Sequence, residues 1–369
     1  MIASSKNYLA VSSSANLANQ LFAKLDKSKK FDFNSENYQR LRSKTPSSDE
    51  FGLFYCDIQK IVQLAPQLGF IDEQYKALLN LIPRQVLANF RMTDKLEQDF
   101  SMHLPKAEMP EELKNIFSYP AKNAWRNFPE KSFLAVNLNL NFLQRAFAYF
   151  AKLSPDKSLN EFMQFFPSSP EQQSSISFSL NNTNITGYPD AQLVVSAPGS
   201  DKLVQRFKTI LGSQSAKSGL NKMDWQSKQI AGQATDFIAT PFGVGLYLTE
   251  TEDKLLLASS ESALGSLLNP NNTLGNRINK ELPAAADKPT AIFSSYIDYT
   301  EIYKIFMNFR NMLGMFIPPD SKQEANAVFE QLESLKRMGS IYFNSSYDGD
   351  VLDFDVVSQP VGKTVQAAS

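Results

Sequence analysis

Cysteine and histidine are almost absent from this chain of 369 residues, which has one of each, Cys56 and His103. A single cysteine excludes an internal disulfide and a thiolate cluster for a metal. Zinc sites and hydrolytic triads depend on histidine, and His103 lies in a strand-like run without a nucleophile nearby. We therefore expect no catalytic residue, no metal site and no cofactor, and we interpret Cys56 as a buried structural thiol.

Long apolar runs and blocks of like charge are also missing. No stretch approaches the roughly 20 apolar residues of a membrane span, and the first residues lack the apolar core of a signal peptide. Lysine and arginine total 37 and aspartate and glutamate total 38, spread over both halves of the chain. Nucleic acid is a poor candidate partner, because a phosphate backbone is bound by concentrated positive charge.

What is present is apolar and internally similar. Hydrophobic residues make up 43% of the chain, and its length exceeds the roughly 250 to 300 residues at which single cores stop growing. Residues 8–17 match residues 255–264 as an apolar strand, a serine turn and a helix start, with Ser13 and Ser260 as N-caps. Residues 51–58 match residues 292–299 in the same way. This similarity predicts an internal duplication of an α/β unit.

Each copy is predicted to continue with helices and end in two strands, and Asp348-Gly349 is a strong hairpin signal in the second copy. A partial echo begins at residue 133. We predict an α+β fold of duplicated modules, with antiparallel or mixed β-sheets packed with helices. Residues 1–110 would be the C-terminal half of a first module that begins before Met1, 111–127 a linker, 128–360 a complete second module and 361–369 a disordered tail. Alternatively, the half module packs against the complete one and nothing is missing.

Asp57 and Asp298 occupy the same position in the two copies, and Asn139 occupies it in the echo. Catalytic carboxylates would recur as carboxylates, whereas asparagine cannot act as a base. Each residue stands where a strand ends and a helix is predicted to begin. We therefore interpret all three as helix N-caps.

Two other patterns suggest ligands but have simpler interpretations. The acidic group Asp348, Asp350, Asp353 and Asp355 could suggest Ca²⁺, but it lacks the carboxylate at the twelfth position of a calcium loop, and alternation favours a solvated strand face. Residues 241–245 contain a G-x-G without the lysine of a phosphate loop. A strand kink or bulge is the better interpretation.

Aromatic residues are the one feature that could form a binding site. They gather in two helical segments, where a protein core and an apolar binding groove are both open interpretations. The candidate apolar binding surface comprises Phe142, Phe147, Phe150, Phe162, Phe165, Tyr303, Phe306, Met307, Phe309, Met312 and Phe316.

The order of elements from Leu282-Pro283 through Ile292–Asp298, with Leu255–Ser260 and Ser340–Val357, resembles a bacterial family of unknown function with duplicated α/β modules. Its members are mostly predicted to be extracytoplasmic and membrane-anchored. The resemblance implies a location in the periplasm or at the cell surface and an anchor before Met1, and it implies no activity. A cytoplasmic location remains the alternative.

Three functions are compatible with these observations. The first is a non-enzymatic cell-envelope protein that binds another envelope protein or scaffolds an assembly. The second is a carrier for an apolar ligand such as a lipid, and the third is a hydrolase that uses only carboxylates. An exposed apolar patch would favour the first, a closed apolar cavity the second, and a cleft with paired carboxylates the third.

Overall fold

The structure is a computed structural model, and it describes residues 2–5, 8–11, 36–44, 49–58, 83–92, 95–121, 124–153, 173–181, 189–197, 202–217, 224–239, 245–252, 254–282, 289–314, 333 and 336–360. The chain divides into two compact units between Pro46 and Ser47. The first unit contains an antiparallel pair of short strands, β1 (Ile2–Ser5) and β2 (Tyr8–Val11), and the helix α2 (Glu36–Lys44).

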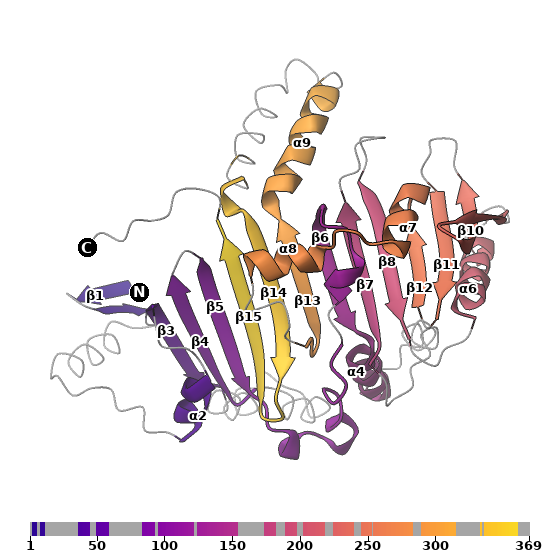
Figure 1. Cartoon of the computed structure of the whole chain (residues 1–369). Coiled ribbons are helices and arrows are strands. Elements are labelled where there is room, and N and C mark those ends of the chain that lie inside the picture. The colour runs from indigo at the N-terminus through magenta and orange to yellow at the C-terminus, as the bar shows by residue number, and fades with distance from the viewer. Residues whose placement is uncertain are drawn as a thin grey trace. The chain divides into compact units, whose positions relative to one another are not determined.

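The second unit contains one sheet of 13 strands in which every pairing is antiparallel (Figure 1). The order across the sheet is β3-β4-β5-β15-β14-β13-β6-β7-β8-β12-β11-β10-β9. The strands are β3 (Glu50–Asp57), β4 (Gln85–Met92), β5 (Leu96–His103), β6 (Ser132–Asn139), β7 (Ser175–Asn181), β8 (Asp190–Ser196), β9 (Gln226–Ile230), β10 (Gln233–Ala239), β11 (Gly245–Thr251), β12 (Lys254–Ala258), β13 (Phe293–Asp298), β14 (Ser340–Tyr347) and β15 (Val351–Gln359). The predicted α+β class is confirmed, with more of the described chain in strands than in helices.

Helices pack on both faces of this sheet. The longer ones are α4 (Leu140–Leu153), α6 (Leu203–Lys217) and α9 (Tyr299–Gly314), and the shorter ones are α7 (Glu261–Leu268), α8 (Leu274–Glu281) and the 3-10 turns η2 (Lys106–Glu108), η3 (Glu111–Leu113) and η4 (Ala124–Asn127). In Figure 1, α7 and α8 lie across the front of the strands. Among the helices of the described residues, none is both long and apolar enough to cross a membrane.

Four segments of the sheet are meanders in which consecutive strands pair: β3-β4-β5, β6-β7-β8, β9-β10-β11-β12 and β13-β14-β15. In the three meanders of three strands the first strand ends at Asp57, Asn139 or Asp298, and each of these residues lies opposite the first residue of the following strand. Three junctions connect the four meanders, because β6 pairs with β13, β5 pairs with β15 and β8 pairs with β12. Strands β2 and β12 come from the matching segments 8–17 and 255–264, but they do not occupy equivalent positions. Among the described strands, β2 pairs with β1 in a separate sheet, whereas β12 lies within the large one.

One face of the sheet is apolar. A row of paired residues on this face runs through Phe90, Val356, Phe343, Val136, Phe178, Leu193, Leu257 and Leu248, interrupted by Gln98 and Ser295. Helix α6 covers one end, where Leu203 and Phe207 pack with Leu248 and Leu257. Helix α4 and the segment 109–117 cover another part, around Leu352 and Phe354. Burial of this surface is the main force that holds the helices to the strands.

The opposite face, the polar face, carries a row of polar side chains, all of them buried except the half-buried Asp99. Paired residues from β4 to β7 form it: Asn89, Asp99, Asp355, Asn344, Ser294, Asn137 and Ser177. Hydrogen bonds connect part of this row, since Ser177 Oγ donates to Asn137 Oδ1 at 2.8 Å and Thr290 Oγ1 donates to Asn344 Oδ1 at 3.2 Å. Such a network stabilises a fold only when its members are paired.

The predicted solvated strand face is therefore wrong for Asp355, which is 9% exposed. Asp353 is half-buried and accepts a hydrogen bond from Ser101 Oγ at 2.6 Å. The reason is a second layer, because η4, α7 and α8 form a core with the polar face around Tyr296 and Tyr342. Alternation along a strand separates its two faces, but it does not show which of them is covered.

The domain boundaries also differ from those predicted. The two units divide near residue 46, and the strands of residues 50–103 belong to the same sheet as the rest of the second unit. The predicted linker 111–127 contains two turns of 3-10 helix and supplies buried residues, with Leu113 and Trp125 each 1% exposed. It is part of the core. The predicted tail 361–369 lies outside the described residues.

Candidate functional site

The residue at the end of each first strand is a helix cap wherever its side chain is described. Asp298 Oδ1 accepts a hydrogen bond from the backbone N–H of Glu301 at 3.1 Å. Asn139 Oδ1 accepts one from the N–H of Phe142, also at 3.1 Å. Ser260 caps α7 in the same way. The capping prediction is confirmed at these positions, whereas Ser13 and the side chain of Asp57 lie outside the described part of the chain.

The second polar atom of each cap explains why one is asparagine and the other aspartate. Asn139 Nδ2 donates to the carbonyl oxygens of Ala291 at 2.8 Å and Tyr119 at 3.0 Å. Asp298 Oδ2 instead accepts a hydrogen bond from Arg277 Nη2 at 2.5 Å. An amide therefore stands where acceptors converge, and a carboxylate stands where a guanidinium lies.

Arg277 ties helix α8 to the start of α9. Its Nε donates to Glu281 Oε1 at 2.8 Å, and its guanidinium lies 5.4 Å from the centre of the Tyr296 ring. Burial disfavours the charged form, but the hydrogen bonds that Arg277 donates to Glu281 and Asp298 and the nearby Tyr296 outweigh it and raise the pKa of Arg277. The guanidinium of Arg277 stays charged, and it holds the carboxylates of Glu281 and Asp298 in place. This cluster is structural.

The single histidine and cysteine have structural surroundings. His103 is 4% exposed, and its Nδ1 lies 2.7 Å from Gln85 Oε1 at hydrogen-bond distance. Cys56 is half-buried rather than buried as predicted, because β3 ends the sheet and has β4 as a neighbour on one side. Across the residues that the structure describes, no three His, Cys, Asp or Glu side chains gather in a way that could hold a metal ion.

The remaining suspected ligand motifs serve the backbone. Asp348 Oδ1 accepts hydrogen bonds from the N–H groups of Asp350 at 3.0 Å and Val351 at 2.9 Å, which closes the predicted turn. A Cβ on Gly245 would lie 2.7 Å from the carbonyl oxygen of Ile238, so this glycine permits the close approach of β10 and β11. Residues 241–244 lie outside the described part.

The aromatic residues of α4 are partly accounted for by the core. Phe142 stacks on Phe117 with ring centroids 5.5 Å apart, beside the cluster that holds η3. Phe147 is half-buried. The side chain of Phe150 is not described, and Phe162 and Phe165 lie outside the described residues. The structure thus places one member of this group in a packed contact rather than a groove.

The residues of α9 are more open. Tyr303 and Met307 are half-buried and Phe306 is 43% exposed. Phe316 and the side chains of Phe309 and Met312 are not described. Helix α4 follows β6 and α9 follows β13, and because these strands are antiparallel neighbours, the helices start at opposite ends of the sheet (Figure 1). The two aromatic groups are not brought together at their starts. Binding of an apolar ligand by either group stays a prediction.

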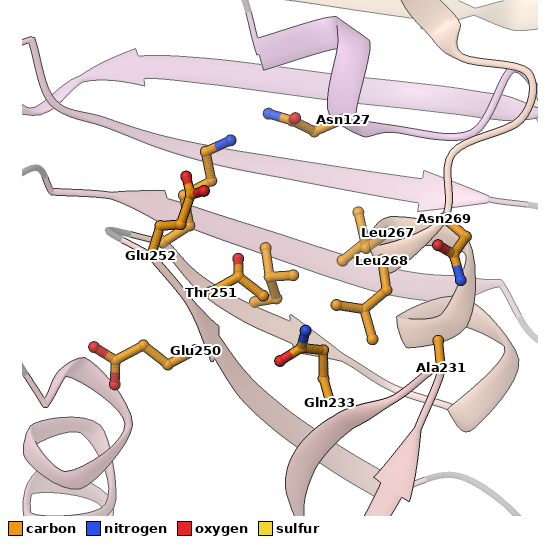
Figure 2. A pocket seen from close by; sticks show the side chains of 11 residues that line it. Asn127, Ala231, Gln233, Glu250, Thr251, Glu252, Leu267, Leu268 and Asn269 are labelled. Carbon is orange, nitrogen blue, oxygen red and sulfur yellow. The ribbon is translucent and has the colours of Figure 1, made fainter.

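A pocket of about 460 Å³ lies on the polar face, between the end of α7 and strands β10 to β12. Leu256, Leu267 and Leu268 form its apolar part, and Gln233, Lys254 and Asn269 supply polar groups (Figure 2). Two residues with left-handed backbone conformation, Ala231 and Glu252, also line it, at the turns between strands. The mixed lining differs from the closed apolar cavity that a lipid carrier needs.

The acids of this pocket do not form a catalytic pair. Glu250 and Thr251 are successive residues of β11, so their side chains point to opposite faces of the sheet. The carboxylate of Glu250 lies on the apolar face, away from the pocket. Glu250 Oε2 accepts a hydrogen bond from the N–H of Val204 at the start of α6, on the apolar face. Glu252 is exposed at the turn. Figure 2 shows the carboxylate of Glu250 directed away from that of Glu252.

Three of the four large exposed apolar side chains that the structure describes in the sheet lie on its end strand β3, and the fourth is Met92 on β4. Phe51 is 61% exposed, Phe54 56% and Leu53 38%. The strand is eight residues long and contains neither lysine nor proline. Edge strands of monomeric proteins are usually blunted by such residues or kept short, because a free edge pairs with other chains.

The opposite end of the sheet is protected in the expected way. Strand β9 has five residues and carries Lys228, which forms an ion pair with Glu261 and lies 4.7 Å from the centre of the Phe237 ring. Gln226, Ser227 and Gln229 are exposed and polar. The two edges of one sheet therefore differ in length, charge and apolar exposure.

No known family, curated protein or solved structure matches the chain. The candidate site consequently rests on its geometry. The sequence carried one usable signal for it, because residues 51–56 are apolar at successive positions instead of alternating. Cys56 in this run was predicted to be buried, whereas it is half-buried and Phe51 and Phe54 are exposed at the edge of the sheet. Nothing in the sequence indicated the pocket, whose residues come from four separate segments.

Proposed function

We propose that this protein is a non-enzymatic scaffold that binds another polypeptide, which adds as a strand to the free edge of β3. The observation that carries the proposal is the exposure of Phe51, Leu53 and Phe54 on an unblunted end strand. Strand addition supplies main-chain hydrogen bonds for affinity, and alternate side chains supply specificity. The protected β9 edge supports the same conclusion, because only one end of the sheet carries an adhesive strand.

The alternatives have less support. A carrier for an apolar ligand needs an enclosed apolar cavity, and the pocket beside α7 has amide and charged groups in its lining. A carboxylate-only hydrolase needs two acids close together in a cleft. In that pocket Glu250 and Glu252 point apart, and elsewhere Asp298 is held by Arg277. The exposed apolar edge is the feature that interaction with a polypeptide explains.

A peptide with the sequence of β6, residues Ser132–Asn139, is a suitable probe, because β6 pairs with the first strand of another meander. We expect the fluorescently labelled peptide to bind the full chain in anisotropy measurements. Phe54→Lys should weaken that binding at least about tenfold, or roughly 1.4 kcal/mol, because a lysine on the edge strand opposes pairing.

Two variants control for a general loss of apolar surface. Met92→Lys changes a side chain that is 53% exposed on the neighbouring strand β4, and Phe306→Lys changes one that is 43% exposed on α9. Both should bind the peptide like the unmodified chain. Equal binding by the Phe54→Lys variant would overturn the proposal, and loss of binding only in the Phe306→Lys variant would move the site to α9.

We infer further that the three meanders of three strands descend from one duplicated unit, as the shared cap position and the shared strand order suggest. A crystal structure with no helix after Asp57 would contradict this. The resemblance named in the sequence analysis supports a location in the cell envelope of a bacterium. Fractionation of the native host is expected to find the protein in the envelope, and recovery in the cytosol alone would refute that location.

A further inference from the structure

We propose that the strand added to β3 is β3 of a second copy of this chain, which gives a two-fold symmetric dimer with one continuous sheet. The inference rests on the proposed function, because it names the polypeptide that occupies the edge.

The meanders of this chain join like to like. The first strand β6 pairs with the first strand β13, and the third strand β5 pairs with the third strand β15, both antiparallel. Two first strands, β3 and β9, have no first strand beside them among the described residues, and of these β9 is the short, polar one. An antiparallel pair of β3 strands from two copies repeats the β6·β13 junction across a two-fold axis, as symmetric dimers require.

The β6·β13 junction also sets the register. Val136 lies three residues before the cap Asn139, Ser295 lies three residues before the cap Asp298, and the two are opposite each other. The same register in β3 places Phe54 opposite Phe54 of the second copy. Leu53 then lies opposite Tyr55, and Cys56 opposite Gly52.

This register suits the side chains. The two Phe54 rings meet at the symmetry axis, on the apolar face that already carries Phe100 and Phe354 in the same row. Aromatic pairs directly across strands stabilise a sheet. Asp57 lies opposite Phe51, so the register sets no acid opposite another acid, and Glu50 lies beyond the paired segment. A pair of eight-residue strands is smaller than a standard interface, so the dimer is expected to be a weak one.

Sedimentation velocity of the full chain over a range of concentrations tests the dimer. We expect a monomer–dimer equilibrium, and Phe54→Lys should raise its dissociation constant at least about tenfold, since it removes both rings and sets two lysines opposite each other. Met92→Lys should leave the equilibrium unchanged. A chain that stays monomeric, or a dimer that Phe54→Lys does not weaken, overturns the proposal.

Cross-linking tests the register. In a Cys56→Ser background, Phe54→Cys places two cysteines directly opposite each other, within reach of a disulfide after mild oxidation. Leu53→Cys is the matched control, because diagonal neighbours lie about 7–8 Å apart, beyond the distance that a disulfide spans. We expect covalent dimer from the first variant only. Equal yields from both, or none from either, would contradict the register and with it the dimer.

The two proposals can fail separately. If the Ser132–Asn139 peptide binds in a Phe54-dependent manner while the chain stays monomeric and does not cross-link, β3 accepts a strand from another protein, and only the second copy is excluded. If neither the peptide nor a second copy depends on Phe54, strand addition at β3 is itself excluded.

Discussion

Replacing Arg277 by methionine should lower the free energy of unfolding by about 3–5 kcal/mol, the cost of leaving a buried carboxylate without its counter-charge. The Asp298 side chain is 5% exposed and its Oδ2 lies 2.5 Å from Arg277 Nη2. Methionine fills similar space, so the loss is mainly electrostatic. Urea unfolding followed by the fluorescence of Trp125 and Trp225, both in the second unit, measures the change.

An exposed ion pair on α9, the helix that Asp298 caps, provides the control. Lys304 is 57% exposed and pairs with Glu301 on α9. Lys304→Ala should change stability by no more than about 0.5 kcal/mol. If the Arg277→Met variant loses no more stability than the Lys304→Ala variant, the buried network contributes little to stability.

A second substitution isolates the charge of Asp298. Asp298→Asn keeps an oxygen for the N–H of Glu301 and so preserves the cap, because asparagine is as good an N-cap as aspartate. In the Arg277→Met background it also removes the unpaired carboxylate. The double variant should therefore be more stable than Arg277→Met alone. If it is less stable, loss of packing rather than of counter-charge explains the effect of the first substitution.

Asn139→Asp should destabilise the protein by about 3 kcal/mol or more at pH 7, although it preserves size and the cap. Asn139 is 0% exposed, and its Nδ2 donates to the carbonyl oxygens of Ala291 and Tyr119. A carboxylate oxygen there would meet two acceptors without a donor or a counter-charge. The introduced acid should consequently have a pKa above its usual range.

The sign of the pH dependence follows from that raised pKa. Below about pH 4, the usual pKa of an aspartate in an unfolded chain, the introduced acid is protonated in both states and its penalty is smallest. As the pH rises, the unfolded chain releases the proton first, so the variant loses stability relative to the unmodified protein. Urea unfolding midpoints measured at several pH values should show this widening gap.

Asn276→Asp is the matched control, because Asn276 is exposed on α8. Its stability should follow that of the unmodified chain within about 0.5 kcal/mol at every pH tested. A pH-independent difference between the Asn139→Asp variant and the unmodified protein would show that the introduced acid does not titrate differently in the folded state, contrary to the geometry of Asn139.

Local features of the fold could be predicted from the sequence because their physics is local. The caps Asn139, Asp298 and Ser260 follow from a polar residue between a strand and a helix, and the turn at Gly349, with φ of 107°, follows from Asp-Gly between alternating runs. Each involves atoms a few residues apart. Such interactions are visible in a short window of sequence.

The parts that could not be predicted depend on contacts between distant residues. The pairing of β15 with β5 joins residues about 250 positions apart, so the sequence suggested a separate half module where there is one sheet. Helix α8 buries Leu274, Gly275 and Ile278 and has few other apolar residues that would predict a packed helix. Arg277 pairs with Asp298 because α9 starts beside α8 in the fold. The helices that bury the polar face are likewise remote in sequence from Asp355.

The exposure of β3 could not be predicted from the sequence for a related reason. A run of apolar residues in a strand indicates burial on both faces, as in the interior of a sheet. Phe51, Leu53 and Phe54 have this composition but stand at the end of the sheet, where one neighbouring strand is absent from the described residues. An apolar run that is exposed in one chain is the pattern expected when burial is completed by another.

The unequal ends of the sheet limit how far assembly can proceed. If both outer strands accepted a partner, copies could add end to end and polymerise into a fibre. Pairing of β3 with itself uses the apolar edge of the 13-stranded sheet in each molecule, and what remains outermost in that sheet on both sides is the short strand with Lys228. Growth therefore stops at a closed pair, and a protein with such a broad sheet can associate through its strands without aggregating.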